Sequence, residues 1–232
     1  MLITPATRVA DVAAHHPRSI DVFERHGIDF CCGGRRPLGE VCREKGLGAE
    51  ELIAALEAVA AEETPADRTW TDAPLGDLVD HIVSRYHTVL RDELPRLGRM
   101  AEKVAEVHGP RHGELAGIAG VYRELRDEME RHLLVEEERV FPAVKRLAEP
   151  GGGKGDLAAA LHGLEEDHGR VGAALAALRA GSGGFVVPED GCNTFRALYE
   201  GLARLEREVH EHVHLENNVL FPRVVSLSAA AV

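Results

Sequence analysis

Two stretches of the chain, HLLVEEERVFP (132–142) and HVHLENNVLFP (212–222), share the pattern H-x-x-x-E-x-x-x-x-F-P and decide the fold. They begin 80 residues apart, and each follows an earlier histidine at nearly the same distance, His87 before the first copy and His168 before the second. A pattern that recurs at a fixed period indicates an internal repeat. The second part of the chain is therefore expected to consist of two similar halves.

Long amphipathic segments surround this repeat. From Pro74 onward, four such segments are separated by three breaks rich in glycine and proline, at 108–113, 149–156 and 180–191. Long helices joined by short loops are typical of an antiparallel four-helix bundle. Aromatic residues make up only 4% of the chain and no segment alternates with period two, so a strand-rich fold is disfavoured. We predict an all-α protein.

The residues before the bundle predict a smaller unit. Short helical patterns flank a glycine-rich turn, FCCGGRRP (30–37), and the stretch 61–74 has two prolines and little periodicity. We therefore expect a small helical domain over 1–64, a linker over 65–74 and the bundle over 75–228.

Composition excludes several classes of protein. The 39 acidic residues exceed the 27 basic ones and leave a net charge of -12, which argues against a nucleic-acid binder. No apolar run approaches the ~20 residues of a membrane helix. The N-terminus carries Pro5, Arg8 and Asp11 where a secretory signal would be apolar. We expect a soluble, cytoplasmic protein with no nucleic-acid or membrane partner.

Four of the 13 histidines lie on the apolar stripes of the predicted helices and should point into the bundle. They are His87, His132, His168 and His212. Glu136 and Glu216 follow one helical turn after His132 and His212, on the same face. In an antiparallel pair of helices, residues equidistant from the turn face each other. The halfway points between His87 and His132, between Glu136 and His168, and between His168 and His212 all fall in the predicted breaks. The six side chains should therefore lie at one level of the bundle.

Other polar residues near the motifs are expected to play a lesser part. His210 and His214 have polar neighbours at helical spacing, and we predict that both are solvated. Asp167 is either a hydrogen-bond partner of a ligand or a solvated acid. Pro142 and Pro222 each remove a helical hydrogen bond, so a kink or a helix end is expected just past each motif.

Six buried imidazole and carboxylate groups require an explanation. A single buried histidine is usually a hydrogen-bonded core residue, but buried carboxylates are too costly to gather without a compensating cation. Imidazole with carboxylate suits iron, manganese or zinc, and six ligands exceed the four that zinc usually takes. If each glutamate bridges two six-coordinate metals, an oxo or hydroxo bridge and two open positions complete the site. A non-haem di-iron centre fits best, and manganese fits the same spacing.

The cysteines offer a second chemistry. Cys31 and Cys32 lie in the glycine-rich turn before two arginines, which favours thiol redox or metal-transfer chemistry, although the turn could also hold them incidentally. Cys42 lies on an apolar face and Cys192 at a predicted helix start.

Together these segments resemble a known family. DFCCGG (29–34), DHIVSRYHTVLRDELP (80–95), the two motif copies and HLENNVLFP (214–222) are similar to the repair-of-iron-centres proteins of the ScdA/YtfE type. The resemblance implies an ScdA-type N-terminal domain before a hemerythrin-like bundle that holds two iron ions per chain. It implies as ligands the residues chosen above by spacing, His87, His132, Glu136, His168, His212 and Glu216, and as its cysteine pair Cys31 and Cys32.

The resemblance also implies a function, the repair of iron–sulfur clusters damaged by oxidative and nitrosative stress. Supply of iron to the damaged proteins is the first hypothesis. Reduction of nitric oxide at the di-iron centre and O2 binding or sensing are the alternatives, with NO or O2 as the small ligand. Whether the protein is an enzyme stays open, and so do the catalytic residues. The sequence leaves the oligomeric state open too, with a homodimer as one alternative.

Overall fold

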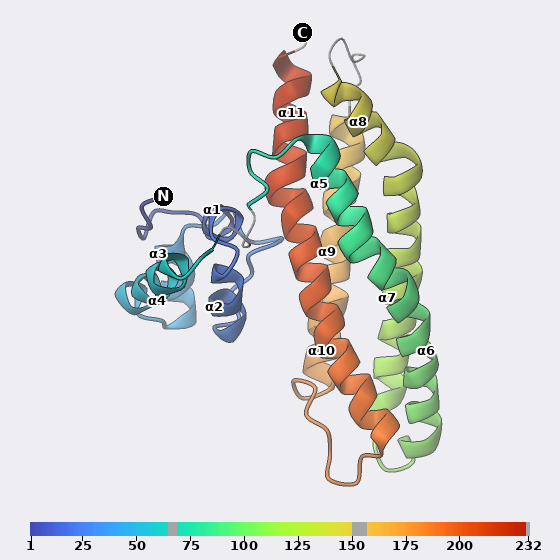
Figure 1. Cartoon of the computed structure of the whole chain (residues 1–232). Helices are drawn as coiled ribbons and strands as arrows, with labels where there is room; N and C mark the ends of the chain where they lie inside the picture. Colours follow the sequence, from blue (N-terminus) through green and yellow to red (C-terminus); the bar gives the residue numbers. More distant parts are fainter. Residues whose placement is uncertain (65–68, 150–156, 231–232) are drawn as a thin grey trace.

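The N-terminal unit consists of short helices packed around the glycine-rich turn (Figure 1). The computed structural model describes residues 1–64, 69–149 and 157–230. We use the name N-terminal unit for residues 1–64. Its helices are α1 (Val9–His15), α2 (Ser19–Arg25), α3 (Leu38–Lys45) and α4 (Ala49–Ala61).

The second part of the chain is an elongated antiparallel bundle of four helical rods (Figure 1). The first rod is α5 (Leu75–Ile82), η1 (Val83–His87) and α6 (Thr88–His108); the second is α7 (Glu114–Val135), η2 (Glu136–Val140) and α8 (Phe141–Ala148). The third is α9 (Ala158–Gly181), and the fourth is α10 (Asn193–His214), η3 (Leu215–Leu220) and α11 (Phe221–Ala230). The predicted all-α bundle is confirmed.

Two sequence predictions fall partly outside the described residues. Positions 150–156 of the second predicted break and 65–68 of the predicted linker are among those not described. The division into a domain of 1–64, a linker of 65–74 and a bundle of 75–228 stays a proposal. Within the described ranges, no helix has the length and apolarity needed to cross a membrane.

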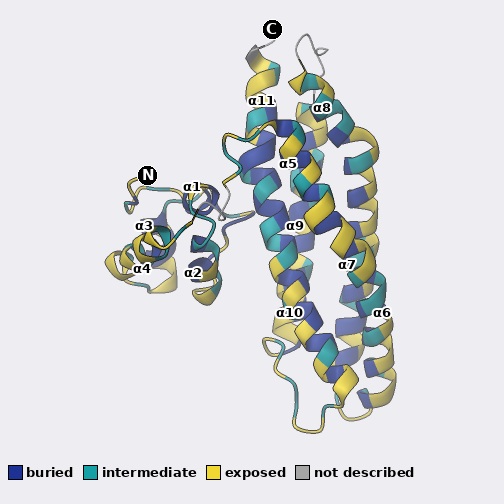
Figure 2. Ribbon diagram, in the orientation of Figure 1, coloured by how far each residue is buried: buried dark blue, intermediate teal, exposed yellow. Residues whose placement is uncertain are grey.

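The buried core of the bundle is divided by the level of the predicted ligands. One apolar cluster lies toward the free ends of α8 and α11 and includes Ile82, Phe141 and Phe221. The other fills the rest of the bundle and includes Leu94 and Leu205, and it continues into the N-terminal unit. Dark buried residues line the interior of the bundle along its whole length (Figure 2). The site therefore sits between two apolar regions that exclude water from both sides.

Three rods contain a short π-helix at this same level. These segments are η1, η2 and η3, and they end at or just before Thr88, Phe141 and Phe221. The π-helix is rare and appears mostly at functional sites. Pro142 and Pro222 follow η2 and η3, and each removes one backbone donor. Of the two outcomes expected past each motif, a kink or a helix end, the helix end is not found, since each rod continues through its proline into α8 or α11 directly after the π-helix.

The turn between α2 and α3 reaches from the N-terminal unit to the side of the bundle (Figure 1). Asp29 Oδ1 accepts hydrogen bonds from the backbone N–H groups of Cys31 and Cys32, at 2.9 and 3.0 Å. A Cβ atom at Gly34 would collide with the carbonyl oxygen of Phe30, so only glycine fits there. The turn is therefore a rigid loop that can hold two thiols against the bundle.

Candidate metal centre

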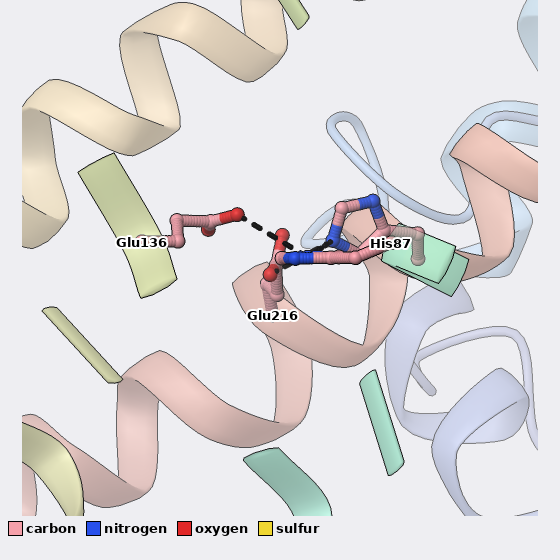
Figure 3. Close-up of side chains that lie close together, drawn as sticks. His87, Glu136 and Glu216 are labelled. Carbon is pink, nitrogen blue, oxygen red and sulfur yellow. Dashed lines mark hydrogen bonds and ion pairs between the residues drawn. The ribbon is translucent and has the colours of Figure 1, made fainter. Parts of the chain in front are cut away.

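The six side chains expected as ligands converge from all four rods. His87 ends η1, His132 lies in α7, Glu136 begins η2, His168 lies in α9, and His212 and Glu216 lie in α10 and η3. All six are buried, with at most 2% of each residue exposed. Figure 3 shows His87, Glu136 and Glu216 pointing toward one another from three different rods.

Their donor atoms form two groups that share both glutamates. His87 and His212 complete one group with Glu136 and Glu216, and His132 and His168 complete the other with the same two carboxylates. Within each group the donor atoms lie within 4.8 Å of one another. This arrangement gives two adjacent positions for a cation, each with two imidazole nitrogens and two carboxylates.

Short distances connect the members of each group. The Nε2 atoms of His87 and His212 lie 3.1 Å apart, and those of His132 and His168 lie 3.0 Å apart. Glu216 approaches His212 Nε2 at 2.9 Å with one oxygen and His168 Nε2 at 3.1 Å with the other. One carboxylate therefore contacts both groups.

A second set of residues orients the imidazole rings through Nδ1. Glu137 lies 2.7 Å from His87 Nδ1, and Asn217 Oδ1 lies 2.7 Å from His168 Nδ1. Asp167, the candidate partner named from sequence, lies 3.4 Å from His132 Nδ1. These contacts leave the Nε2 atoms free to face the interior. Ligating histidines usually donate their other ring N–H to such an acceptor.

The fourth ring is oriented differently. Tyr86 stacks on His212 with ring centroids 5.7 Å apart and an angle of 12° between the rings. His212 Nδ1 has no hydrogen-bond partner among the residues that the structure describes. Aromatic packing thus replaces the hydrogen bond that fixes the other three rings.

The protein groups alone distribute charge unevenly over the site. Burial, with help from His212, lowers the pKa of His87 to about 4. Burial also opposes charge on His132, but the carboxylate of Glu136 outweighs it and raises the pKa of His132 to about 9. Burial and the nearby Glu216 raise the pKa of Glu136. The two carboxylates therefore repel each other, and a cation between them would relieve this repulsion.

Unsatisfied oxygens support the same interpretation. Both carboxylate oxygens of Glu136 and Oε2 of Glu216 are buried and accept no hydrogen bond of favourable geometry among the described residues, although imidazole nitrogens lie 3.1 to 3.5 Å from the Oε2 atoms. A buried carboxylate without compensation costs several kcal/mol. Imidazole nitrogens and carboxylate oxygens are donors that iron accepts. The residues present therefore fit a pair of iron ions.

The two candidate thiols lie beside this site. Cys31 is buried and Cys32 is exposed, and their sulfur atoms are 3.7 Å apart. Cys32 Sγ lies 3.8 Å from the backbone carbonyl oxygen of His168. The hydrogen bond between the two thiols and burial raise the pKa of Cys31, whereas the same hydrogen bond lowers the pKa of Cys32. Cys32 is thus the sulfur that ionises first.

The prediction that His214 is solvated is wrong, and His210 is only half-buried rather than solvated. His214 is 2% exposed, because Phe30 of the N-terminal unit covers it with ring centroids 5.7 Å apart. Its Nδ1 lies 3.2 Å from the carbonyl oxygen of Phe30. Periodicity within one helix could not reveal this contact, since the partner is 184 residues away.

Asn218 completes the docking of the glycine-rich turn. Its Nδ2 donates hydrogen bonds to the carbonyl oxygens of Phe30, at 3.3 Å, and Cys31, at 2.9 Å. Sequence reasoning missed this role, although the amides in HLENNVLFP (214–222), where the first motif copy has glutamates, are a visible difference between the copies.

Comparisons with known proteins agree with this geometry. Residues 6–60 match a family model described as ScdA_N, a domain of unknown function. Residues 78–224 match the hemerythrin HHE cation binding domain. The second match spans all six candidate ligands.

Whole-chain relatives cover both parts. The chain is 38% identical to the iron-sulfur cluster repair protein ScdA of Staphylococcus haemolyticus, over 95% of this chain and 98% of that protein. It is 37% identical to the iron-sulfur cluster repair protein YtfE of Pectobacterium carotovorum, over 94% and 96%. The protein of the same name from Yersinia pestis is 36% identical, over 90% and 92%.

Proposed function

Because the chain belongs to the ScdA/YtfE family of iron–sulfur cluster repair proteins, we propose that its hemerythrin-like bundle holds two iron ions and supplies iron to damaged clusters. The partners are iron–sulfur proteins whose clusters have been damaged by oxidative or nitrosative stress. The iron is cargo in this proposal, and the bundle is its store.

The observation that carries the proposal is the pair of donor groups that share Glu136 and Glu216. Each iron would have two nitrogen and two carboxylate donors from the protein, so neither would be fully enclosed by protein ligands. Two carboxylates fall short of neutralising two divalent or trivalent ions, which favours an oxo or hydroxo bridge between them. Incomplete enclosure favours a releasable ion over a permanently held one.

The position of the thiols supports delivery to a client protein. Cys31 and Cys32 line a cavity of about 650 Å³ between the N-terminal unit and helices α9 and α10. Gly169 and Gly172 of α9, one and four residues after His168, form part of its wall. Thiolate is a good ligand for iron leaving an imidazole and carboxylate site. We propose that Cys32 is the contact through which iron passes to the acceptor.

Reconstitution of a damaged enzyme tests the proposal. Iron-loaded protein is mixed anaerobically with an aconitase-type enzyme whose cluster has lost iron, and recovery of activity is followed. We expect faster recovery than with free Fe²⁺ at the same concentration, and no recovery with the iron-free E136A variant. The matched control is E138Q, because Glu138 lies in the same motif copy but is exposed. Recovery no faster than with free iron would contradict iron supply.

The two open positions also allow small ligands, and two assays separate the alternatives. Anaerobic turnover of NO to N2O by the reduced protein would make the site an NO reductase, whereas stoichiometric NO binding would not. Reversible O2 uptake would indicate an O2 carrier or sensor. The position of Cys32 beside His168 favours iron supply over O2 carriage, because a simple O2 carrier has no use for a thiol pair. We place the protein in the cytoplasm, where its free cysteines would stay reduced.

A further inference from the structure

A cysteine–histidine pair lies away from the candidate metal centre, at the end of the bundle where α6 ends and α10 begins. Cys192 directly precedes α10 and is exposed, and His108 is the last residue of α6. His108 Nε2 and Cys192 Sγ lie 3.2 Å apart. In Figure 1 these positions are at the lower end of the bundle, where the loop before α10 meets the end of α6. None of the functions proposed above uses this pair.

The surroundings of His108 determine which ring nitrogen carries the proton. His108 is only 4% exposed, and Phe195 packs against its ring with centroids 5.3 Å apart. Its Nδ1 is buried and has no hydrogen-bond partner among the described residues. A buried N–H group without an acceptor is rarer and costlier than an unpaired ring nitrogen. The proton therefore resides on Nε2, which donates it to the sulfur of Cys192.

The backbone at Cys192 adds a second favourable interaction. Cys192 is the N-cap of α10, a helix of 22 residues, with φ -73° and ψ 173°. Its side chain makes no capping hydrogen bond, since the sulfur faces His108 instead. The N-terminus of a helix carries a partial positive charge. The Nε2–H of His108 and the helix terminus thus both present positive partial charge to an exposed sulfur.

Neighbouring charges do not cancel this effect. Asp190, the acid two residues before Cys192, lies 2.9 Å from His112 Nε2 and 3.3 Å from Arg111 Nε. Its negative charge is therefore compensated by groups other than Cys192.

We propose that Cys192 is a reactive thiol that forms mixed disulfides with low-molecular-weight disulfides. The proton of Cys192 goes to solvent, and the sulfur, held by the Nε2–H of His108, attacks one sulfur of the disulfide. The Cys192 S–S bond forms as the original S–S bond breaks, and the leaving thiolate takes up a proton. One disulfide is exchanged for another, so no further oxidant is needed.

The test measures modification of each cysteine separately by mass spectrometry, with glutathione disulfide as the probe at pH 7. We expect Cys192 in the folded full-length chain to react roughly three- to tenfold faster than Cys192 in the urea-unfolded chain. Folding normally protects a thiol, so a faster reaction in the folded state requires activation. A folded rate equal to or below the unfolded rate would overturn the proposal without any variant.

Two variants assign the activation to His108. H108Q keeps a side-chain amide donor but loses the ring geometry, and we expect the Cys192 rate to fall to that of the unfolded chain. H162Q removes an exposed imidazole of α9, which lies 3.6 Å from Glu166 and has no part in this pair, and should leave the rate within twofold of the parent. An unchanged rate in a folded H108Q protein would contradict the role of the histidine.

Discussion

The two copies of the repeated motif carry the same ligands but face different surroundings. The first copy, 132–142, lies on an outer side of the bundle, and Leu134 is 53% exposed. The second copy, 212–222, lies under the N-terminal unit, and His214, at the position equivalent to Leu134, is 2% exposed. Positions of the proposed metal ligands are thus alike in both halves, whereas positions that face outward differ according to what covers them.

The differences that change polarity or charge fall at four positions. Leu134, Glu137, Glu138 and Arg139 of the first copy correspond to His214, Asn217, Asn218 and Val219 of the second. Glu137 pairs with Arg91 and His87 at a half-exposed position, while Asn217 is buried against His168. A carboxylate tolerates contact with water, whereas a neutral amide satisfies a buried ring nitrogen without a further charge. Burial against His168 therefore explains the asparagine at 217, and docking of the N-terminal unit explains the one at 218, whose amide donates to the carbonyl oxygens of Phe30 and Cys31.

The largest expected effect comes from the glutamates, at which the two copies should behave alike. E136A and E216A should each lose most of the bound iron, because each carboxylate belongs to both donor groups. H132A should lose iron as well, although less of it, because His132 belongs to only one of the two groups. Since metal binding adds to folding stability, each variant should also gain less thermal stability on iron loading than the parent. Iron per chain and melting temperature measure both effects.

The exposed Glu138 provides the control, because E138A should retain the parent iron content. Unchanged iron in both E136A and H132A would contradict the ligand assignment. Retention of one iron in E136A and none in E216A would show that only one glutamate bridges, and would break the symmetry between the copies.

The next effect should appear in the second copy alone. N218E removes hydrogen bonds to the carbonyl oxygens of Phe30 and Cys31 and places a carboxylate against them, which should weaken docking by about 2 kcal/mol or more. The buried Cys31 should then be alkylated faster. Cys42, buried inside the N-terminal unit, should stay protected and so report that the unit is still folded.

The equivalent change in the first copy is E138N, which should leave Cys31 protected. Equal exposure of Cys31 in both variants would show that the amide at 218 does not hold the turn.

A smaller effect is expected from the residues behind the ligands. E137A and N217A each remove the acceptor of one ligating ring, so each should weaken iron binding by roughly tenfold. Competition with a chromogenic chelator measures the affinity. We expect the loss in N217A to be the larger, because its orphaned His168 Nδ1 is buried, whereas water can reach the half-exposed position of Glu137. The reverse order would contradict the proposed effect of burial.

The same comparison shows what a sequence can predict. The four histidines were predictable because each must lie on an apolar stripe, and helical spacing reports that directly. Asp167 could be named as a candidate because it adjoins His168. Docking of Phe30 on His214 and Asn218 could not be predicted, since it joins segments more than 180 residues apart that share no local pattern. The π-helices were also missed, because their cause is the hydrogen bonding of a whole turn rather than a residue type.

The smallest expected effect concerns the ion pairs that hold the N-terminal unit. Arg207 of α10 pairs with Asp21 and with Glu24, the latter at 3.0 Å, whereas its equivalent one repeat earlier, Asp127, is exposed and pairs with Arg126. Half-exposed pairs contribute little, so R207Q should weaken docking by about 1 kcal/mol or less.

Cys31 alkylation should rise slightly in R207Q and not in D127N. Added salt should raise the rate of Cys31 alkylation in the parent. It should raise this rate much less in R207Q, because the ion pairs that salt screens are already absent from that variant. A salt response equal in both proteins would place the electrostatic part of docking elsewhere, at Arg35 and Glu165.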